Sequence, residues 1–491
     1  MMSSTSKNTF YLLGASIYQK LLSLIYLILL ARFLGVENFG KYAFAFSFTV
    51  MFSVFLDLAL STVLTREIAR DQSKAKDYLN NILSLKFFIS LIIFLLLFFL
   101  INLFSYPSLT KNYVYIATLI MIIDSFSFSL YQVFRGHLNL KFEGVGIIFN
   151  RTISFIIGLI FILLKLPPFF VILPILFGTV LYFLNALFFL KKEIGFFPSF
   201  SFDRSIIKLL LVIALPFFIA AIFSQLFGTI DTVLLSFLKG DRAVGLYSSA
   251  QKVVIAIGTL IGGSLSGAIY PAFSYYFVRS KEKLSLLFNK GIFYLFLIFL
   301  PSIFGILFLA KPLISVVYGK EYLEASATLK IIGFSLPFMF LDYLVFSLLN
   351  ACEKQKINTF NRGVAVFCLV AANLILIPHF SHFGSAISCL IGFFVLFILD
   401  FYASLKIIKI DKKYLREKMK GIALSTLLMS LFILFLKGEL QVFVLVILAG
   451  LVYFLSLYFL KVVGKEEINM LKEIFRTSKF NNLIHRNSQN L

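Results

Sequence analysis

Two lysines lie in the middle of long apolar stretches, where a charged side chain is costly. Lys20 is roughly ten residues from either end of its stretch, which is too deep for its amine to reach the membrane surface along its own stem. Lys252 lies in a second such stretch, closer to one end. Packing between helices requires no charge at these positions, so we expect both ammonium groups to face a water-filled cavity.

Uncharged polar residues follow the same helical stripes as the lysines. Ser16 and Ser23 share a face with Lys20, Thr259 shares one with Lys252, and Gln225, Thr229 and Thr232 are spaced to form a third stripe. Close packing between helices explains such stripes equally well, because small and hydroxyl residues are common at helix interfaces in membranes. The residues expected to line a cavity are Lys20, Lys252, Ser16, Ser23, Gln225, Thr229, Thr232 and Thr259.

Four acidic residues also fall within apolar stretches: Asp57, Asp124, Asp231 and Asp342. An acid in this position can bind a coupling cation, carry a proton or pair with a basic neighbour. Asp124 and Asp342 have candidate partners in Arg151 and Arg362, which open the stretches that follow them. The sequence leaves ion coupling and internal pairing open.

No metal or cofactor site is expected. The four histidines are scattered among ends and connections, and the three cysteines have no metal or redox spacing. The chain contains no HExxH, Walker or GxSxG motif and no connection long enough for a soluble domain, so we expect a protein that is not an enzyme. Coupling to H⁺ or Na⁺ stays possible through the intramembrane acids.

The elements that must position these residues are membrane-spanning helices. Hydrophobic residues make up 60% of the 491-residue chain, and charged residues only 14%. Because a bilayer core needs about 20 apolar helical residues for each crossing, the sequence predicts an all-α polytopic protein with about fourteen spans. The spans are expected near 10–34, 42–64, 82–104, 113–134, 145–165, 169–190, 209–236, 247–271, 291–317, 327–350, 362–379, 384–405, 421–437 and 440–461.

Basic residues indicate the orientation. If the N-terminus is cytoplasmic, roughly three of every four of the 45 lysines and arginines fall in connections on the cytoplasmic side. Lys86, at the start of the third predicted span, belongs to that set. The sequence therefore predicts a multi-pass protein of the inner or plasma membrane with both termini cytoplasmic. Its net charge of +22 is explained by loops that face anionic lipid headgroups, so nucleic acid is not an expected partner.

The chain repeats itself internally. The segment Phe33–Tyr42 and the segment Phe237–Tyr247 both read as Phe-Leu, a short charged turn and Gly-x-Tyr. Asp124 and Asp342 each precede a Phe-Ser-Leu run, and each is followed by an Asn-Arg pair. These echoes predict two six-helix halves, 1–200 and 201–410, related by an axis along the membrane normal. Two further helices in 411–464 and a cytoplasmic tail, 465–491, complete the expected organisation.

The N-terminal motifs identify a family resemblance. The run Leu30-Ala31-Arg32-Phe33-Leu34-Gly35, followed by Phe39-Gly40-x-Tyr42 and by Thr65-Arg66-Glu67-Ile68-Ala69-Arg70-Asp71, resembles the signature of Wzx-type polysaccharide flippases. These belong to the multidrug/oligosaccharidyl-lipid/polysaccharide exporter superfamily, together with the MATE and lipid II flippase families. The resemblance covers the first twelve predicted spans.

The resemblance implies a flippase that moves a polyprenyl-diphosphate-linked oligosaccharide from the cytoplasmic to the external leaflet by alternating access. Essential basic positions of the related lipid II flippase fall on Lys20 and Lys252, which would offset the diphosphate charge. Another of its basic positions falls on Tyr26, which argues against lipid II as the cargo. The implied partners are membrane lipids and the lipid-linked oligosaccharide. A polysaccharide polymerase or other assembly proteins are further candidate partners.

Three alternatives remain. A MATE-like multidrug exporter would favour acidic over basic residues in its cavity, because its substrates are amphipathic cations. A lipid II flippase is disfavoured by Tyr26. A membrane-embedded polysaccharide polymerase would need a sizeable external loop, and the sequence has none.

Overall fold

The structure, a computed structural model, describes residues 4–464. Within this range the chain is built from helices and turns and contains no strand. Ten helices are long and apolar enough to cross a membrane, and the bent pair Ala325–Gly333 and Leu336–Ala351 raises the number to eleven. The predicted all-α polytopic class is therefore confirmed.

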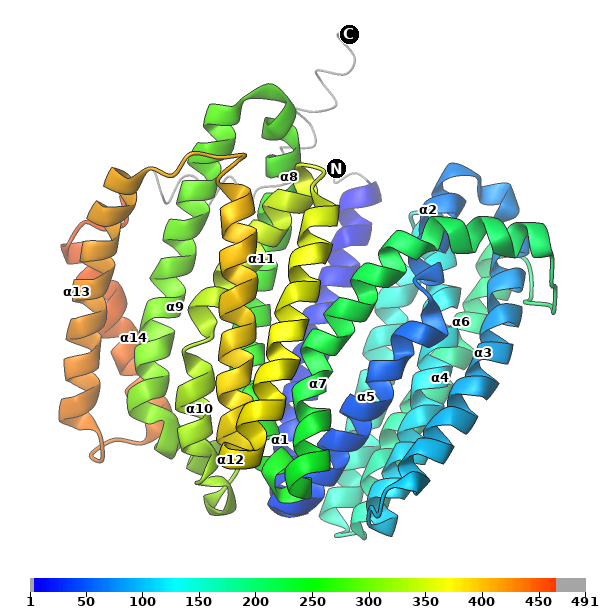
Figure 1. The fold of residues 1–491 in the computed structure, drawn as a ribbon, viewed down its shortest axis with the longest axis horizontal. Helices are drawn as coiled ribbons and strands as arrows, with labels where there is room; N and C mark the ends of the chain where they lie inside the picture. Colours follow the sequence, from blue (N-terminus) through cyan, green and yellow to red (C-terminus); the bar gives the residue numbers. More distant parts are fainter. Residues whose placement is uncertain (1–3, 465–491) are drawn as a thin grey trace. The chain divides into compact units, whose positions relative to one another are not determined.

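Three of the long helices each consist of two arms. The backbone leaves helical geometry at Gly35 in α1 (Ser4–Asp57), at Gly240 in α7 (Arg204–Ile257) and at Ser381 in α12 (Gln355–Ser404). At the first two positions the sequence predicts connections of several residues, whereas the structure turns at a single glycine between helical arms (Figure 1). The number of membrane crossings and the cytoplasmic location of both termini stay predictions.

The chain folds into two compact units, residues 1–245 and 246–491, of which the second is described to residue 464. In unit 1, α1 packs against α4 and α5, and α5 packs against α6 (Figure 1). Its helices are α1, α2 (Leu60–Arg70), α3 (Ala75–Leu103), α4 (Ser108–Gly136), α5 (Lys141–Leu163), α6 (Leu173–Phe189) and the first arm of α7.

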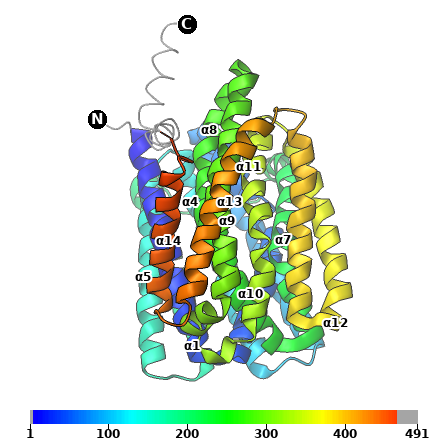
Figure 2. The same ribbon diagram turned by 90° about the vertical axis from the view of Figure 1, so that its left-hand side faces the viewer.

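Unit 2 is organised around α11, which packs against α8, α9 and α12. The two C-terminal helices α13 and α14 pack against each other and against α9 (Figure 2). Its helices are the second arm of α7, α8 (Ser264–Arg279), α9 (Lys281–Val317), α10 (Ala325–Gly333), α11 (Leu336–Ala351), α12, α13 (Lys412–Leu436) and α14 (Val442–Phe459). The predicted halves 1–200 and 201–410 stay predictions, and the predicted tail 465–491 lies outside the described residues.

The repeated turn motif has one backbone conformation in both copies. Gly35 has φ 70° and ψ 174°, and Gly240 has φ 77° and ψ −175°. A positive φ of this kind is available to glycine at little steric cost, which explains why glycine stands at both breaks. Within unit 1 the two motifs also touch, because the Cα of Gly40 abuts the carbonyl of Asp241 and that of Gly245 abuts the carbonyl of Val36.

Candidate functional site

A cavity of about 620 Å³ lies among α1, α2, α4, α6 and the first arm of α7, entirely within unit 1. We call it the polar chamber, because two carboxyl groups and several hydroxyl groups line it. Its size falls within the range of ligand pockets, roughly 300–1,000 Å³. The lining residues are Val50, Ser53, Val54, Asp57, Ala59, Thr62, Met121, Asp124, Ser125, Phe128, Tyr182, Phe217, Ala220, Ala221 and Gln225.

A fully buried lysine neutralises one of the two chamber acids. Lys86 Nζ donates to Asp57 Oδ1 at 2.6 Å and is 0% exposed. The same ammonium lies 2.7 Å from the Ser129 hydroxyl, 3.0 Å from the Ser125 hydroxyl and 3.2 Å from the Ser61 hydroxyl. These oxygens replace the water that burial removes, and they hold α1, α2, α3 and α4 together at one point.

Lys86 corrects one expectation from the sequence. It counts there among the cytoplasmic basic residues because it stands at the start of an apolar stretch. In the structure it lies inside α3, about three turns beyond Ala75, the first buried residue of that helix. Asp57 thus forms an internal ion pair with Lys86, and a role for it in ion coupling stays a prediction.

Asp124, the second chamber acid, has no ion pair among the described residues. Arg151 acts on it electrostatically, but the two charged groups do not approach to ion-pair distance. With its amide oxygen turned toward Arg151, Gln19 instead accepts from Arg151 Nε at 3.3 Å and from Nη2 at 3.1 Å. The chamber therefore contains one carboxylate that is not neutralised by direct contact.

The equivalent residues of unit 2 do form a pair. Arg362 Nη2 lies 3.4 Å from Asp342 Oδ2, and both side chains are largely buried. Asn361 Nδ2 donates to Asp400 Oδ1 at 2.7 Å, and the Asp342 and Asp400 carboxyl groups act on each other electrostatically. Asp400 is not among the acids singled out from the sequence, although it falls within the predicted span 384–405.

The two intramembrane lysines are both exposed. Lys20 forms no hydrogen bond or ion pair with any residue of the described range. It lies on α1 in unit 1, whereas Lys252 lies on the second arm of α7 in unit 2. Exposure at mid-span keeps the amine of Lys20 accessible to a ligand or to water.

The other polar residues predicted from the sequence have three kinds of environment. Gln225 lines the polar chamber. The hydroxyls of Ser16, Thr229 and Thr259 each donate to a backbone carbonyl one turn earlier in their own helix. Ser23 is half-buried, while Asp231 and Thr232 are buried, with the Asp231 carboxylate accepting from the Thr232 backbone N–H.

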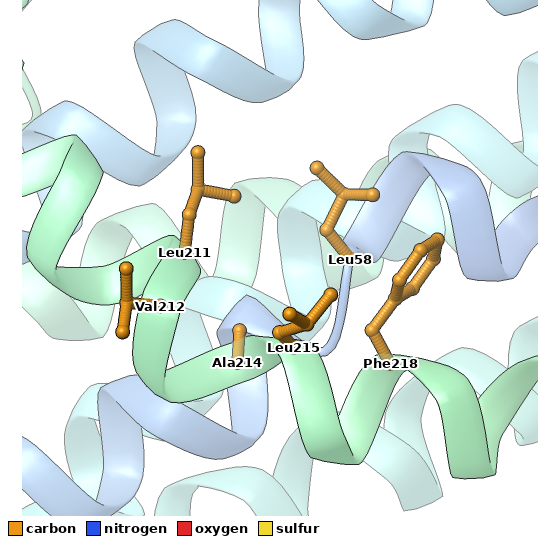
Figure 3. Close-up of a pocket in the computed structure, with 6 residues that line it drawn as sticks. All are labelled: Leu58, Leu211, Val212, Ala214, Leu215 and Phe218. Atoms are coloured by element: carbon orange, nitrogen blue, oxygen red, sulfur yellow. The ribbon is translucent and has the colours of Figure 1, made fainter.

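Beside the chamber, α1 ends in a strained break. Leu58 and Ala59 have φ of 50° and 58°, the left-handed region that residues with a Cβ rarely adopt. On the other side of this break lies an apolar groove of about 330 Å³, lined by Leu58, Leu211, Val212, Ala214, Leu215 and Phe218. Figure 3 shows Leu58 facing the α7 segment that carries the other five side chains.

Asp57 and Phe217 line the chamber, whereas their neighbours Leu58 and Phe218 line the apolar groove. The polar and apolar compartments are thus one residue apart on both helices. Among the described residues, no three His, Cys, Asp or Glu side chains come together as a metal site.

Comparison with known proteins adds the family. The model of the family described as "Polysaccharide biosynthesis protein" matches residues 5–277, and a second one, described as MatE, matches 216–378. The chain is 24% identical over 401 residues to "Capsular polysaccharide biosynthesis protein CapF" of Staphylococcus aureus, covering 81% of this chain and 98% of that protein.

A second relative matches part of the chain, and a solved structure has the same fold. The chain is 24% identical over 281 residues to "Uncharacterized membrane protein MJ1068" of Methanocaldococcus jannaschii, covering 56% of this chain and 55% of that protein. The solved structure "Lipid II flippase MurJ, inward closed conformation" superposes with a TM-score of 0.75 at 19% identity, covering 90% of this chain and 96% of that one. Because the matching family model covers more than half of the sequence, this chain belongs to the polysaccharide biosynthesis protein family, within the superfamily that also contains the MATE transporters and the lipid II flippase.

Proposed function

We propose that this protein is a flippase that moves a polyprenyl-diphosphate-linked oligosaccharide from the cytoplasmic to the external leaflet, for assembly of a surface glycan. Family membership carries the proposal, together with a fold that matches that of a lipid II flippase along nearly the whole chain. A flippase must hold a polar head group within the bilayer while the lipid tail stays outside the protein.

Lys20 and Lys252 are the residues that we propose bind the diphosphate. Each is exposed within a span, where a charge has no role in packing. Lysine offers a point charge to phosphate rather than the two-pronged contact of arginine, and that charge is what a transported anion needs during crossing. The chamber hydroxyls and Gln225 would hydrogen-bond sugar hydroxyls.

The experiment measures lipid-linked oligosaccharide by mass spectrometry in cells that lack this protein, with a membrane-impermeant glycan probe to report the leaflet. We expect full-length units to accumulate on the inner leaflet and wild-type protein to relieve the accumulation. A Lys20→Ala/Lys252→Ala variant should not relieve it, and a Lys20→Arg/Lys252→Arg variant should. Lys76, an exposed lysine of α3, gives the matched control Lys76→Ala.

The outcomes separate the activity from its site. Rescue by the double alanine variant would remove the lysines from the mechanism and keep the flippase. Accumulation of finished units in the external leaflet, or none at all, would overturn the flippase itself.

The chamber supports a second candidate, a MATE-like exporter of amphipathic cations. Its wall carries Asp124 without a directly paired cation, and the MatE family model matches residues 216–378. Such an exporter would lower the ethidium content of energised cells, and Asp124→Asn would abolish the effect. Ethidium efflux without any change in lipid-linked oligosaccharide would favour this candidate over the flippase.

A further inference from the structure

The first arm of α7 carries two cations and an apolar stripe in one helical register. Arg204 and Lys208 are one turn apart, and Val212 and Leu215 continue the same face. All four side chains are exposed, with Val212 at 65% and Leu215 at 56%. Neither Arg204 nor Lys208 forms an ion pair within residues 4–464.

The segment before α7, residues 195–203, indicates the depth of Arg204 and Lys208 in the membrane. Residues 195–203 form no regular helix, so they cannot lie in the hydrocarbon core exposed to lipid, and α7 must begin at the membrane boundary. Asn80 and Asn81 of α3 hold this segment by accepting from the backbone N–H groups of Ser199 and Asp203 at 3.0 and 2.6 Å. Asp203 in turn caps α7 by accepting from the N–H of Ser205 at 2.7 Å.

Distances along the helix then separate a head region from a chain region. Lys208 lies about 6 Å along the axis from Arg204, and Val212 lies about 6 Å further on, from a rise of about 1.5 Å per residue. The two cations therefore stand at headgroup depth, and the apolar groove begins where the hydrocarbon begins. A ligand that matches this order has an anionic head followed directly by a hydrocarbon chain.

We propose that the apolar groove binds the hydrocarbon chain of the isoprenyl carrier, with Lys208 and Arg204 binding its phosphate. This site would load the lipid-linked substrate before it crosses, and the identity of the carrier rests on the proposed function. A lysine or arginine near a membrane surface contributes roughly 1 kcal/mol to binding an anionic lipid. The Lys208 ammonium acts on a phosphate as a point charge, and the Arg204 guanidinium can donate two hydrogen bonds to it.

Two observations distinguish the groove from an ordinary lipid-facing helix. The first is the strained break, since two successive left-handed residues with side chains persist only where the surrounding structure imposes them. That strain places the Leu58 side chain in the groove and leaves Asp57 in the chamber. The second observation is that the apolar groove lies next to the polar chamber. A head group that leaves Lys208 could therefore enter the chamber while its hydrocarbon chain stays in the groove.

The chain has no tryptophan, so a single introduced tryptophan reports one position. The full-length Leu215→Trp variant would be reconstituted in nanodiscs of phosphatidylcholine with brominated acyl chains, which quench its fluorescence. Titration with geranylgeranyl diphosphate should relieve the quenching as the isoprenyl chain displaces brominated chains. Ile447→Trp, on the exposed face of α14, gives the matched control and should stay quenched.

Adding Lys208→Ala to Leu215→Trp should raise the half-maximal concentration about fivefold, whereas adding Lys76→Ala should not change it. Relief at both tryptophans, relief at neither, or no effect of Lys208→Ala would overturn the proposal. Equal relief by phosphatidylglycerol would overturn the carrier as ligand and leave a general site for anionic lipid. Binding is measured here without transport, so a failure of the leaflet experiment would count against the proposed function alone.

Discussion

Lys86 and Asp57 form an ion pair of 2.6 Å although they lie 29 residues apart and on different helices. Of the two acids that line the polar chamber, Asp57 is neutralised by this ion pair, whereas Asp124 forms no ion pair among the described residues. It also lies directly before the strained break at Leu58 and Ala59. The ammonium of Lys86 thus neutralises one of the two chamber acids, at the residue that precedes the break.

Breaking this pair should destabilise the protein strongly. Removing one partner of a buried ion pair costs about 3–5 kcal/mol, because the other charge stays buried without compensation. We expect Lys86→Met to show this full loss and Asp57→Asn a smaller one, since the Asp57 side chain is 24% exposed. Thermal unfolding of the detergent-solubilised protein measures both, and Lys76→Ala is the control.

The double variant Lys86→Met/Asp57→Asn separates charge from packing. It removes both charges, so it should recover most of the midpoint that Lys86→Met loses. A double variant that is less stable than either single variant would show that the two residues contribute independently. An unchanged midpoint for Lys86→Met would contradict the role of the ion pair.

The sequence predicts those parts of the molecule that depend on local pattern. Apolar stretches long enough to cross a bilayer indicate the all-α class, and the repeated turn motif marks the breaks at Gly35 and Gly240. The echo between the two Asn-Arg pairs offers Arg151 and Arg362 as partners for Asp124 and Asp342, and the structure forms only the second of these ion pairs among the described residues, at 3.4 Å. The apolar stretches and the turn motif lie in the segments whose structure they predict.

Contacts that depend on packing between distant helices are not visible in the same way. Lys86 resembles a loop lysine because its partner comes from another helix, and Asp400 is unremarkable until Asn361 folds against it. The break at Leu58 and Ala59 has no glycine or proline to announce it. The break directly follows Asp57, whose ion pair with Lys86 exists only in the folded chain.

The reciprocal glycine contact should not tolerate a side chain. A Cβ at Gly40 would overlap the carbonyl of Asp241, and one at Gly245 would overlap the carbonyl of Val36. We expect Gly40→Ala and Gly245→Ala each to lower stability by about 1–3 kcal/mol, as overpacking does. Unfolding midpoints in detergent would measure the loss.

Gly228 supplies the control for this substitution. It lies in the helical first arm of α7, and nothing stands within 4 Å of a Cβ built on it. Gly228→Ala should therefore leave stability unchanged or raise it by up to about 1 kcal/mol, because alanine favours the helix. Equal losses at Gly40 and Gly228 would show that the close contact is not the cause.

In unit 2, two carboxyl groups share one guanidinium. Arg362 forms an ion pair with Asp342, and the Asp400 carboxyl group repels that of Asp342. Asp400→Asn should be nearly neutral for stability, because an amide removes this repulsion and its oxygen still accepts from Asn361. Arg362→Met should cost about 3–5 kcal/mol, because Asp342 then loses its cation. Destabilisation by Asp400→Asn as large as that by Arg362→Met would contradict the repulsion between the two acids.

Cys352 lies in the connection between α11 and α12, and the pH dependence of its reactivity tests whether the thiol is buried there. The thiol is 1% exposed, and burial raises its pKa to about 11. Only the thiolate reacts with maleimides, so roughly one thiol in a thousand is reactive at pH 8. In a Cys368→Ser/Cys389→Ser variant, we expect N-ethylmaleimide to label the folded protein slowly and the denatured protein quickly.

The sign of the pH dependence follows from the two states of the chain. The thiol of the unfolded chain ionises near pH 8.5, at about the value for free cysteine, whereas the folded thiol stays protonated to about pH 11. The contribution of Cys352 to stability is therefore constant below pH 8.5 and falls as the pH rises toward 11. Cys352→Ala should remove this part of the decline, which thermal unfolding between pH 7 and 10 would measure. Labelling of the folded variant at pH 7 as fast as in denaturant would contradict the buried, protonated thiol.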